Sequence, residues 1–174
     1  MPRPWFERRF SFAHLADDDL PVVVERLRGT PARVEEKVRD LPRGLVTRRD
    51  GDGWSIQEHV GHLLDLDELH EGRLDDYRAG AASLRPADLE NRRTHEARHN
   101  EGDLARLFAA FRERRGRFVE RLDSWDPRRL PATAVHPRLG QPMRVVDMAC
   151  FVAEHDDHHL ARMSELLRKG GAPG

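Results

Sequence analysis

Apolar positions in this chain recur at helical spacing over four long stretches, and no stretch keeps the alternation of a β-strand. The four stretches cover about residues 18–41, 55–79, 103–124 and 142–170. Apolar residues three and four positions apart fall on one face of an α-helix, so each stretch predicts a helix with one buried face. Four such helices predict an all-α protein, and a four-helix bundle is its natural architecture.

Two features at helix boundaries refine this prediction. Ser55-Ile56-Gln57-Glu58 has the pattern of a capping box, which predicts a well-defined start for the second helix. Gly29-Thr30-Pro31 interrupts the first helix. The sequence is compatible with a new helix that Thr30 caps and with one helix that kinks at Pro31.

The segments outside the helices predict one domain with a long crossover connection and an N-terminal arm. Residues 80–101 are polar and loop-like, and several prolines mark a long third connection that should cross one end of the bundle: Pro127, Pro131, Pro137 and Pro142. Residues 1–17 mix aromatic side chains with arginines, so we expect an ordered arm across the bundle, whereas residues 169–174 should form a flexible tail. A length of 174 residues suits a single domain over 1–174.

The last helix carries the run His155-Asp156-Asp157-His158-His159. On a helical wheel, His155 and His159 fall within about 20° of the centre of the apolar face. A buried imidazole without a polar partner costs a few kcal/mol, and one divalent metal ion would serve both rings. The alternative is a pair of core histidines bonded to carbonyl groups or water. His158 falls at the edge of the apolar face, so we expect it in the wall of a pocket.

A metal site needs a third ligand from another helix, and the second helix offers His59, His62 and His70. Its apolar residues cluster on one side, and His62 lies about 120° from that side, facing a neighbouring helix. His59 lies nearer the apolar centre. Periodicity therefore leaves His59 and His62 as alternatives.

Three motifs occur in order along the chain: Trp54-Ser55-Ile56-Gln57-Glu58, then Gly61-His62-Leu63, then the His-x-x-x-His of the last helix. Together they resemble the DinB/YfiT-like superfamily of metal-binding four-helix bundles, and the resemblance covers roughly residues 18 to 168. It implies that His62, His155 and His159 bind one divalent ion, usually zinc or nickel, at the end of the bundle where the second and last helices meet. It also implies open coordination positions. The aromatic residues of the arm, Trp5, Phe6, Phe10 and Phe12, either pack on the bundle of the same chain or complete a homodimer, as the resemblance suggests.

Members of this superfamily include low-molecular-weight-thiol S-transferases and proteins described as metal-dependent hydrolases. In both reactions a metal ion lowers the pKa of a thiol or water, so a small-molecule substrate is implied, and a low-molecular-weight thiol is one candidate. Glu58, Asp156 and His158 are candidate catalytic groups around the ligands, as proton carriers, although Glu58 also has the capping role. The alternative is a non-catalytic metal-binding or stress-response protein whose ion is structural or sensing.

Charge and cysteine content exclude several other classes of function. Lys and Arg number 30 and Asp and Glu number 31, which gives a formal net charge of −1 and no long-range attraction to nucleic acid or to an anionic membrane. The single cysteine, Cys150, excludes an internal disulfide and fits a reducing compartment. No apolar run approaches the roughly 20 residues of a membrane span, and the N-terminus lacks the apolar core of a secretory signal. We therefore expect a cytoplasmic protein.

Two other metal-binding classes fit the sequence poorly. A zincin protease needs Glu directly after the first histidine of its helical pair, and this chain has Asp156 there. A carboxylate-bridged di-iron bundle needs Glu-x-x-His on two helices, whereas the candidate here, Glu96-Ala97-Arg98-His99, lies in a loop-like stretch.

Overall fold

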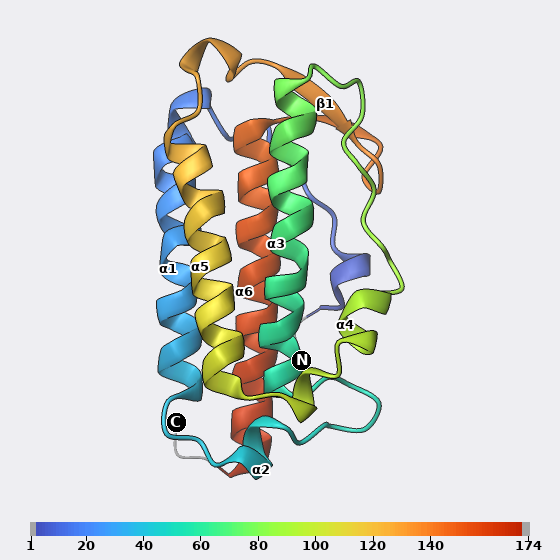
Figure 1. The fold of residues 1–174 in the computed structure, drawn as a ribbon. Helices are drawn as coiled ribbons and strands as arrows, with labels where there is room; N and C mark the ends of the chain where they lie inside the picture. Colours follow the sequence, from blue (N-terminus) through green and yellow to red (C-terminus); the bar gives the residue numbers. More distant parts are fainter. Residues whose placement is uncertain (1–2, 172–174) are drawn as a thin grey trace.

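The computed structural model describes residues 3–171, and its framework is a bundle of four long helices (Figure 1). These are α1 (Leu20–Val38), α3 (Ile56–Arg78), α5 (Leu104–Asp123) and α6 (Val145–Gly170). The predicted all-α four-helix bundle is therefore confirmed. The remaining elements are short: α2 (Arg43–Val46), α4 (Arg92–Glu96), β1 (Thr133–His136), β2 (Gln141–Arg144) and the 3₁₀ turns η1 (Trp5–Glu7), η2 (Asp17–Asp19), η3 (His99–Glu101) and η4 (Pro127–Arg129).

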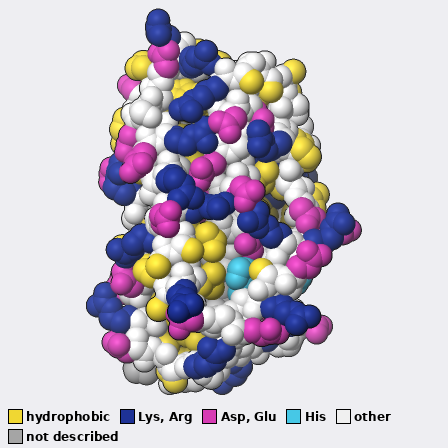
Figure 2. Space-filling view, viewed as in Figure 1, with side chains coloured by type: hydrophobic (Ala, Val, Ile, Leu, Met, Phe, Trp, Pro, Cys, Tyr) yellow, Lys and Arg dark blue, Asp and Glu magenta, His cyan; other side chains and the backbone are white. Residues whose placement is uncertain are grey.

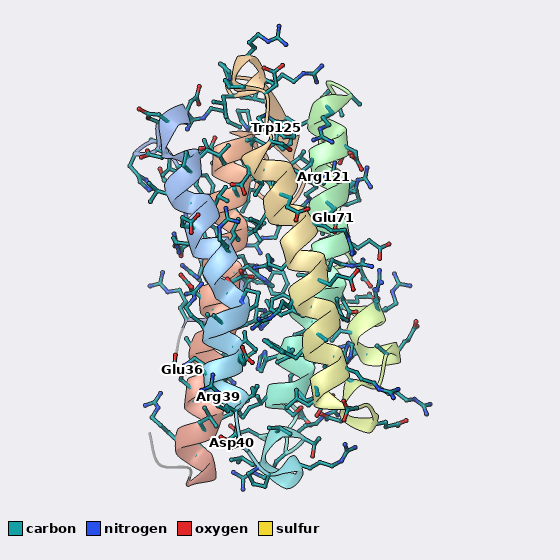
Figure 3. The ribbon with its side chains drawn as sticks, turned by 60° about the vertical axis from the view of Figure 1, so that its left-hand side comes forward. Glu36, Arg39, Asp40, Glu71, Arg121 and Trp125 are labelled. Carbon is teal, nitrogen blue, oxygen red and sulfur yellow. The ribbon has the colours of Figure 1, made fainter. Side chains whose placement is uncertain are left out.

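The helices follow a down-up-up-down course, and the long connection between the parallel helices α3 and α5 makes this possible. Both α1 and α6 run from the upper to the lower end in Figure 1, whereas α3 and α5 run upward. The segment 79–103 returns along the side of the bundle from the end of α3 to the start of α5, and the segment 124–144 crosses the upper end. Helices α3 and α5 are neighbours, as Figure 3 shows for Glu71 and Arg121, where Arg121 Nη1 donates to the carbonyl oxygen of Glu71 at 2.9 Å.

Helix α1 continues without a break through Pro31. Thr30 does not cap a new helix, because it lies inside α1, and its hydroxyl group donates to Asp156 Oδ2 of α6 at 2.7 Å. Both Thr30 and Pro31 are buried. Packing against α6 thus keeps one helix intact at a residue that removes a backbone hydrogen bond.

The third connection contains a short hairpin that the sequence pattern did not predict. Strands β1 and β2 pair antiparallel, with Ala134 opposite Met143 and both side chains buried. Four-residue strands, one of them with Pro142, are too short to show the alternation of a strand. The hairpin also holds the α3–α5 connection, since the amide of Leu84 donates to the carbonyl oxygen of Val135 at 2.9 Å.

Two apolar clusters fill the bundle above and below a buried polar layer. One cluster includes Leu27, Leu74, Phe118 and Met148, and the other includes Val34, Val60, Phe111 and Met163. Each long helix contributes polar side chains to the layer between them, and its buried members include Thr30, His62, Asp67, His70, Arg115, His155, Asp156 and His159. This layer contains the site described below.

Residues before α1 lie across the bundle and contact α6. The ring centroid of Trp5 lies 5.1 Å from that of Phe151 and 4.9 Å from that of His155. Arg8 Nη2 lies 2.5 Å from Glu154 Oε2, which holds the arm beside α6. Residues 1–2 of the predicted arm lie outside the described residues.

The predicted flexible tail begins inside a helix. Helix α6 extends to Gly170, and Gly171 ends it with a φ of 74°. Lys169 Nζ lies 2.5 Å from Asp50 Oδ2, so an ion pair to the loop before α3 supports the last turn. Residues 172–174 of the predicted tail lie outside the described residues. Within the described chain, no helix is long and apolar enough to cross a membrane.

Candidate metal centre

His62, His155 and His159 come together between α3 and α6. One ligand atom from each lies within 4.8 Å of the other two. His62 lies in the second turn of α3, and the other two histidines lie near the middle of α6. The cluster therefore lies along the side of the bundle, not at its end.

The capping box fixes where α3 begins and hence which way His62 points. The amide of Glu58 donates to Ser55 Oγ at 3.1 Å, and the amide of Ser55 donates to Glu58 Oε2 at 2.9 Å. This is the reciprocal pair of a capping box, as the sequence predicted. With the start of the helix fixed, the 100° step per residue sets the direction of His62 toward α6.

Burial keeps the three imidazoles neutral. His62, His155 and His159 are 3%, 7% and 5% exposed. Desolvation is the main cause that lowers the pKa of His62 to about 4, and it holds the pKa of His155 and of His159 well below the ordinary value. All three rings therefore carry a free lone pair at neutral pH, which is the form that binds metal ions.

The hydrogen bonds of the cluster leave its inner nitrogens for a ligand. His155 Nε2 and His159 Nε2 lie 3.0 Å apart, and His159 Nδ1 lies 2.8 Å from His59 Nδ1. His62 Nδ1 lies 3.1 Å from Thr94 Oγ1. His155 Nδ1 is buried without a partner among residues 3–171. Neighbouring side chains thus occupy the outer nitrogens of His62 and His159, and this set of neutral imidazoles fits a divalent transition metal.

A hydrogen-bond chain behind His62 selects its tautomer. Thr94 Oγ1 donates to Asp65 Oδ2 at 2.9 Å, so the hydroxyl group has no further proton to give. It must accept the hydrogen bond from His62 Nδ1–H, which leaves the lone pair on His62 Nε2. His99 Nε2 also lies 2.9 Å from Asp65 Oδ2 and completes the chain. Such partners orient a metal-binding imidazole.

Thr94 and His99 belong to α4 and η3, inside the stretch that the sequence predicted to be loop-like. The available sequence signal was Gly61, directly before His62. A Cβ atom built on Gly61 would lie 2.2 Å from His99 Cδ2. Glycine is therefore needed at this position, because only a helix surface without a side chain lets His99 reach Asp65.

The three candidate catalytic groups occupy different places. Glu58 remains at the helix cap, where Arg49 Nε donates to its Oε2 at 2.9 Å. Asp156 points away from the histidines, and Arg115 Nη2 donates to its Oδ1 at 3.1 Å. His158 is half-buried in the cavity wall, with its ring centroid 5.8 Å from that of Trp5. Among the three, only His158 lines the cavity.

The histidine cluster opens onto a cavity of about 640 Å³. Its walls come from the arm, the turn before α3, the α3–α5 connection, the hairpin turn, and helices α3 and α6; aromatic members include Trp5, Phe6, Trp54 and Phe151. Figure 2 shows one face on which a histidine reaches the surface between hydrophobic side chains, while acidic and basic side chains are interspersed over the rest. The cavity has the volume of a typical small-molecule site, and His62, His155 and His159 lie in its wall.

The fold and the site define a helical bundle with a buried three-histidine cluster of metal-ligand geometry beside a cavity. The model of the DinB superfamily matches residues 26–163, so the chain belongs to this superfamily, as the motifs indicated. A comparison with curated proteins found no match.

A solved structure has a similar fold over nearly the whole chain. It is described as "YfiT from Bacillus subtilis is a probable metal-dependent hydrolase with an unusual four-helix bundle topology", with a TM-score of 0.76 and 20% sequence identity. The match covers 96% of this chain and 95% of that chain. At this identity the likeness establishes the shared bundle topology.

Proposed function

We propose that this protein binds one divalent metal ion through His62, His155 and His159 and uses it to activate a small nucleophile. The observation that carries the proposal is the position of three neutral imidazoles, with ligand atoms within 4.8 Å of one another, beside an open cavity. A purely structural site is usually closed by four protein ligands. Three ligands next to a cavity leave room for an exchangeable one.

Zinc or nickel is the metal that this donor set favours. Imidazole is a borderline ligand that suits both ions, whereas magnesium and calcium prefer oxygen ligands. Among the described residues, no carboxylate belongs to the cluster. The donor set therefore supports zinc or nickel over the oxygen-preferring ions.

A bound ion of this kind lowers the pKa of a coordinated water or thiol and supplies a nucleophile near neutral pH. The chain orients His62 through Thr94 and Asp65, and its aromatic walls limit access of bulk water. His158 is the titratable group best placed to carry a proton between the cavity and solvent, because it is half-buried in the wall. Hydrolysis and thiol S-transfer are the two reactions that this arrangement supports.

The position of His59 supports a second candidate function, a closed metal site without turnover. His59 also lines the cavity, and because its Nδ1 contacts the outer nitrogen of His159, Nδ1, at 2.8 Å, its ring would have to turn from this contact to reach an ion held by the other three histidines. If His59 served as a fourth protein ligand, the site would be structural or sensing. The His59→Ala variant separates the two functions, since an open three-histidine site keeps its metal and a four-histidine site loses affinity.

Metal analysis of purified variants tests the proposal. We expect one equivalent of zinc or nickel in the wild type, loss of metal in His62→Ala, His155→Ala and His159→Ala, and retention in the matched control His158→Ala. Hydrolysis of an amide or ester, or addition of a small thiol to an electrophile, should disappear on chelation and return with metal. Full metal retention in His62→Ala would exclude this ligand set.

We also propose that the protein forms a homodimer through the apolar rim of the cavity. Phe6 is 60% exposed and Leu89 is 55% exposed, and both line the cavity entrance. Light scattering of the wild type and of Phe6→Ser measures this. A monomer at high micromolar concentration contradicts the dimer and leaves the metal site unaffected.

A further inference from the structure

A buried arginine without an anionic partner lies in the cavity wall. Arg73 of α3 is 2% exposed, and it lines the cavity. Its Nε donates to the carbonyl oxygen of Arg85 at 3.2 Å, whereas neither Nη group has a hydrogen-bond acceptor among residues 3–171. A buried cation with no counter-ion is costly and seldom retained without a use.

The nearby carboxylate and hydroxyl groups that could pair with Arg73 are engaged elsewhere. Asp76 pairs with Arg85, whose Nη2 lies 2.8 Å from Asp76 Oδ1. Tyr77 donates its hydroxyl proton to the carbonyl oxygen of Met143 at 2.8 Å. Desolvation lowers the pKa of Arg73 to about 10, which still leaves the guanidinium group charged at neutral pH. The two Nη groups therefore remain available to a ligand.

Two histidines beside Arg73 also lack partners. His70 Nδ1 and His136 Nε2 are buried without a hydrogen bond in the described part of the chain, and both residues line the cavity. His70 and Arg73 lie three residues apart on α3 and therefore share one face of that helix, and His136 of β1 lines the same cavity. They come from α3 and from β1, so two separate elements build this end of the cavity.

We infer that Arg73, with His70 and His136, forms a subsite for the carboxylate group of the substrate. A guanidinium group binds the two oxygens of a carboxylate side by side, and a neutral imidazole can donate one further hydrogen bond. One buried positive charge balances one negative charge, which favours a carboxylate over a dianionic phosphate. This inference rests on the proposed function for the identity of the substrate's reactive end.

The subsite also sets the shape of the substrate. Arg73 follows His62 by three turns of α3, or roughly 16 Å along the helix axis. The cavity between them has the aromatic walls described above. We therefore expect an elongated molecule, with an apolar body, a carboxylate at Arg73 and its reactive group at the histidine cluster.

A second arginine at the entrance supports the same preference. Arg138 lies over the ring of Trp5 at 5.3 Å and over that of Phe6 at 5.2 Å, and it makes no ion pair with a described residue. It is half-buried and lines the cavity. Its positive charge attracts an anionic molecule toward the entrance.

The test uses phenylacetate and its neutral amide, phenylacetamide, with protein freed of metal by chelation. Without metal, the carboxylate cannot bind at the histidine cluster through an ion, so titration calorimetry reports binding by the side chains of the cavity, and the Arg73 variants then identify the part that Arg73 contributes. We expect phenylacetate to bind the wild type at least about tenfold more tightly than the amide, because its hydrogen bonds are charge-assisted. Inorganic phosphate, as a third probe, should bind more weakly than phenylacetate.

Variants assign the effect to the subsite. Arg73→Gln should abolish the preference for phenylacetate, Arg73→Lys should keep part of it, and the exposed control Arg128→Gln should keep all of it. Removal of an unpaired buried charge should also leave the Tm of metal-free Arg73→Gln equal to or above that of the wild type. Equal binding of acid and amide by the wild type, which needs no variant, would overturn the inference, as would an unchanged preference in Arg73→Gln. Tighter binding of phosphate than of phenylacetate would also overturn it.

Metal content measured on the same variants separates this inference from the proposed function. Arg73→Gln should retain one equivalent of metal. Binding of phenylacetate to a protein that never takes up metal would contradict the proposed function and leave the subsite intact. Normal metal content without a preference for phenylacetate would contradict the subsite and leave the proposed function intact.

Discussion

The polar layer of the bundle contains two clusters that satisfy their polar groups in opposite ways. In the first, Arg115 lies between Asp67 and Asp156, and all three side chains are at most 1% exposed. Arg115 Nε and Nη2 contact Asp67 at 3.0 and 2.8 Å, and its Nη1 and Nη2 contact Asp156. The second cluster, His62, His155 and His159, has no charge and leaves His155 Nδ1 without a partner among the described residues.

This contrast separates a polar cluster whose partners all come from the protein from the cluster that we propose to bind a metal ion. The guanidinium group of Arg115 finds both of its partners within the protein and lies away from the cavity, so the cluster needs nothing further. The histidines face a cavity, and their inner nitrogens point at one another. Equal burial therefore does not imply equal function; what differs is whether the protein itself supplies every partner.

The largest expected effect is on stability, from Arg115→Met. This change leaves two buried carboxylates without their cation, and breaking such a pair costs about 3–5 kcal/mol. Urea unfolding of the metal-free protein measures the loss, and Arg128→Met, which removes an exposed pair, should change stability by less than about 0.5 kcal/mol. The metal content of folded Arg115→Met should remain one equivalent. Loss of metal at unchanged stability would reverse the roles of the two clusters.

The next effect is on metal affinity, from His159→Ala. Removal of one ligand of three should lower the affinity by more than the 10–100-fold that loss of a supporting group causes. The unfolding free energy of the metal-free protein should change less than in Arg115→Met, because the histidine has no buried charge to leave unpaired. Competition with a chromophoric chelator measures the affinity. An effect larger on metal-free stability than on metal binding would make the histidines structural.

The change of unfolding free energy with pH, measured on metal-free protein, should have opposite signs for the two clusters. The pKa of His62 is lowered to about 4 by burial, so the unfolded chain takes up a proton below about 6.5 that the folded protein refuses. Its contribution to stability is thus lost as the pH falls from 6.5 to 4. We expect the wild type to lose up to about 1.4 kcal/mol per pH unit more than His62→Ala in this window.

Asp67 should show the opposite dependence. Burial raises its pKa from 3.8 to about 6, so the folded protein favours the protonated form. Its contribution is fully present below pH 3.8 and is lost as the pH rises through about 6. Asp67→Asn should therefore flatten the pH dependence between 4 and 6 in the direction opposite to His62→Ala, as measured by urea unfolding at each pH.

The smallest effect is expected from Gly61→Ala. The added methyl group occupies the space of the His99 ring and separates His99 from Asp65, while His62 keeps its place on α3. Metal affinity should fall about tenfold, the lower range for loss of a supporting hydrogen bond. The double variant Gly61→Ala/His99→Ala relieves the clash and should bind metal as His99→Ala alone does. A further loss in the double variant would show that Gly61 acts through the helix itself.

The sequence by itself determined those features that depend on local spacing. Helical periodicity indicated the long helices, and Ser55 with Glu58 indicated the start of α3. His155 and His159, four residues apart, must share one face of a helix in any fold. The order of the motifs also indicated the superfamily, which the match over residues 26–163 establishes.

Only the tertiary structure decided which partner each helix face meets. A helical wheel gives the directions of His59 and His62 on α3. The packing of α3 on α6 is what groups His62 with His155 and His159. The same packing places His59 against the outer nitrogen of His159, Nδ1. Packing against α6 likewise carries α1 through Pro31.

The same reason applies to Asp156 and to the cavity. Asp156 follows His155 directly, so the helical step turns it toward α1 and α5. There it accepts hydrogen bonds from Thr30 and Arg115, which lie in distant parts of the chain. The cavity walls combine side chains of α3 and α6, such as Arg73, with Trp5 of the arm and His136 of the hairpin, which lie in segments of little or no periodicity. Local sequence sets the direction of a side chain along its own element, and the long-range fold alone sets what it meets there.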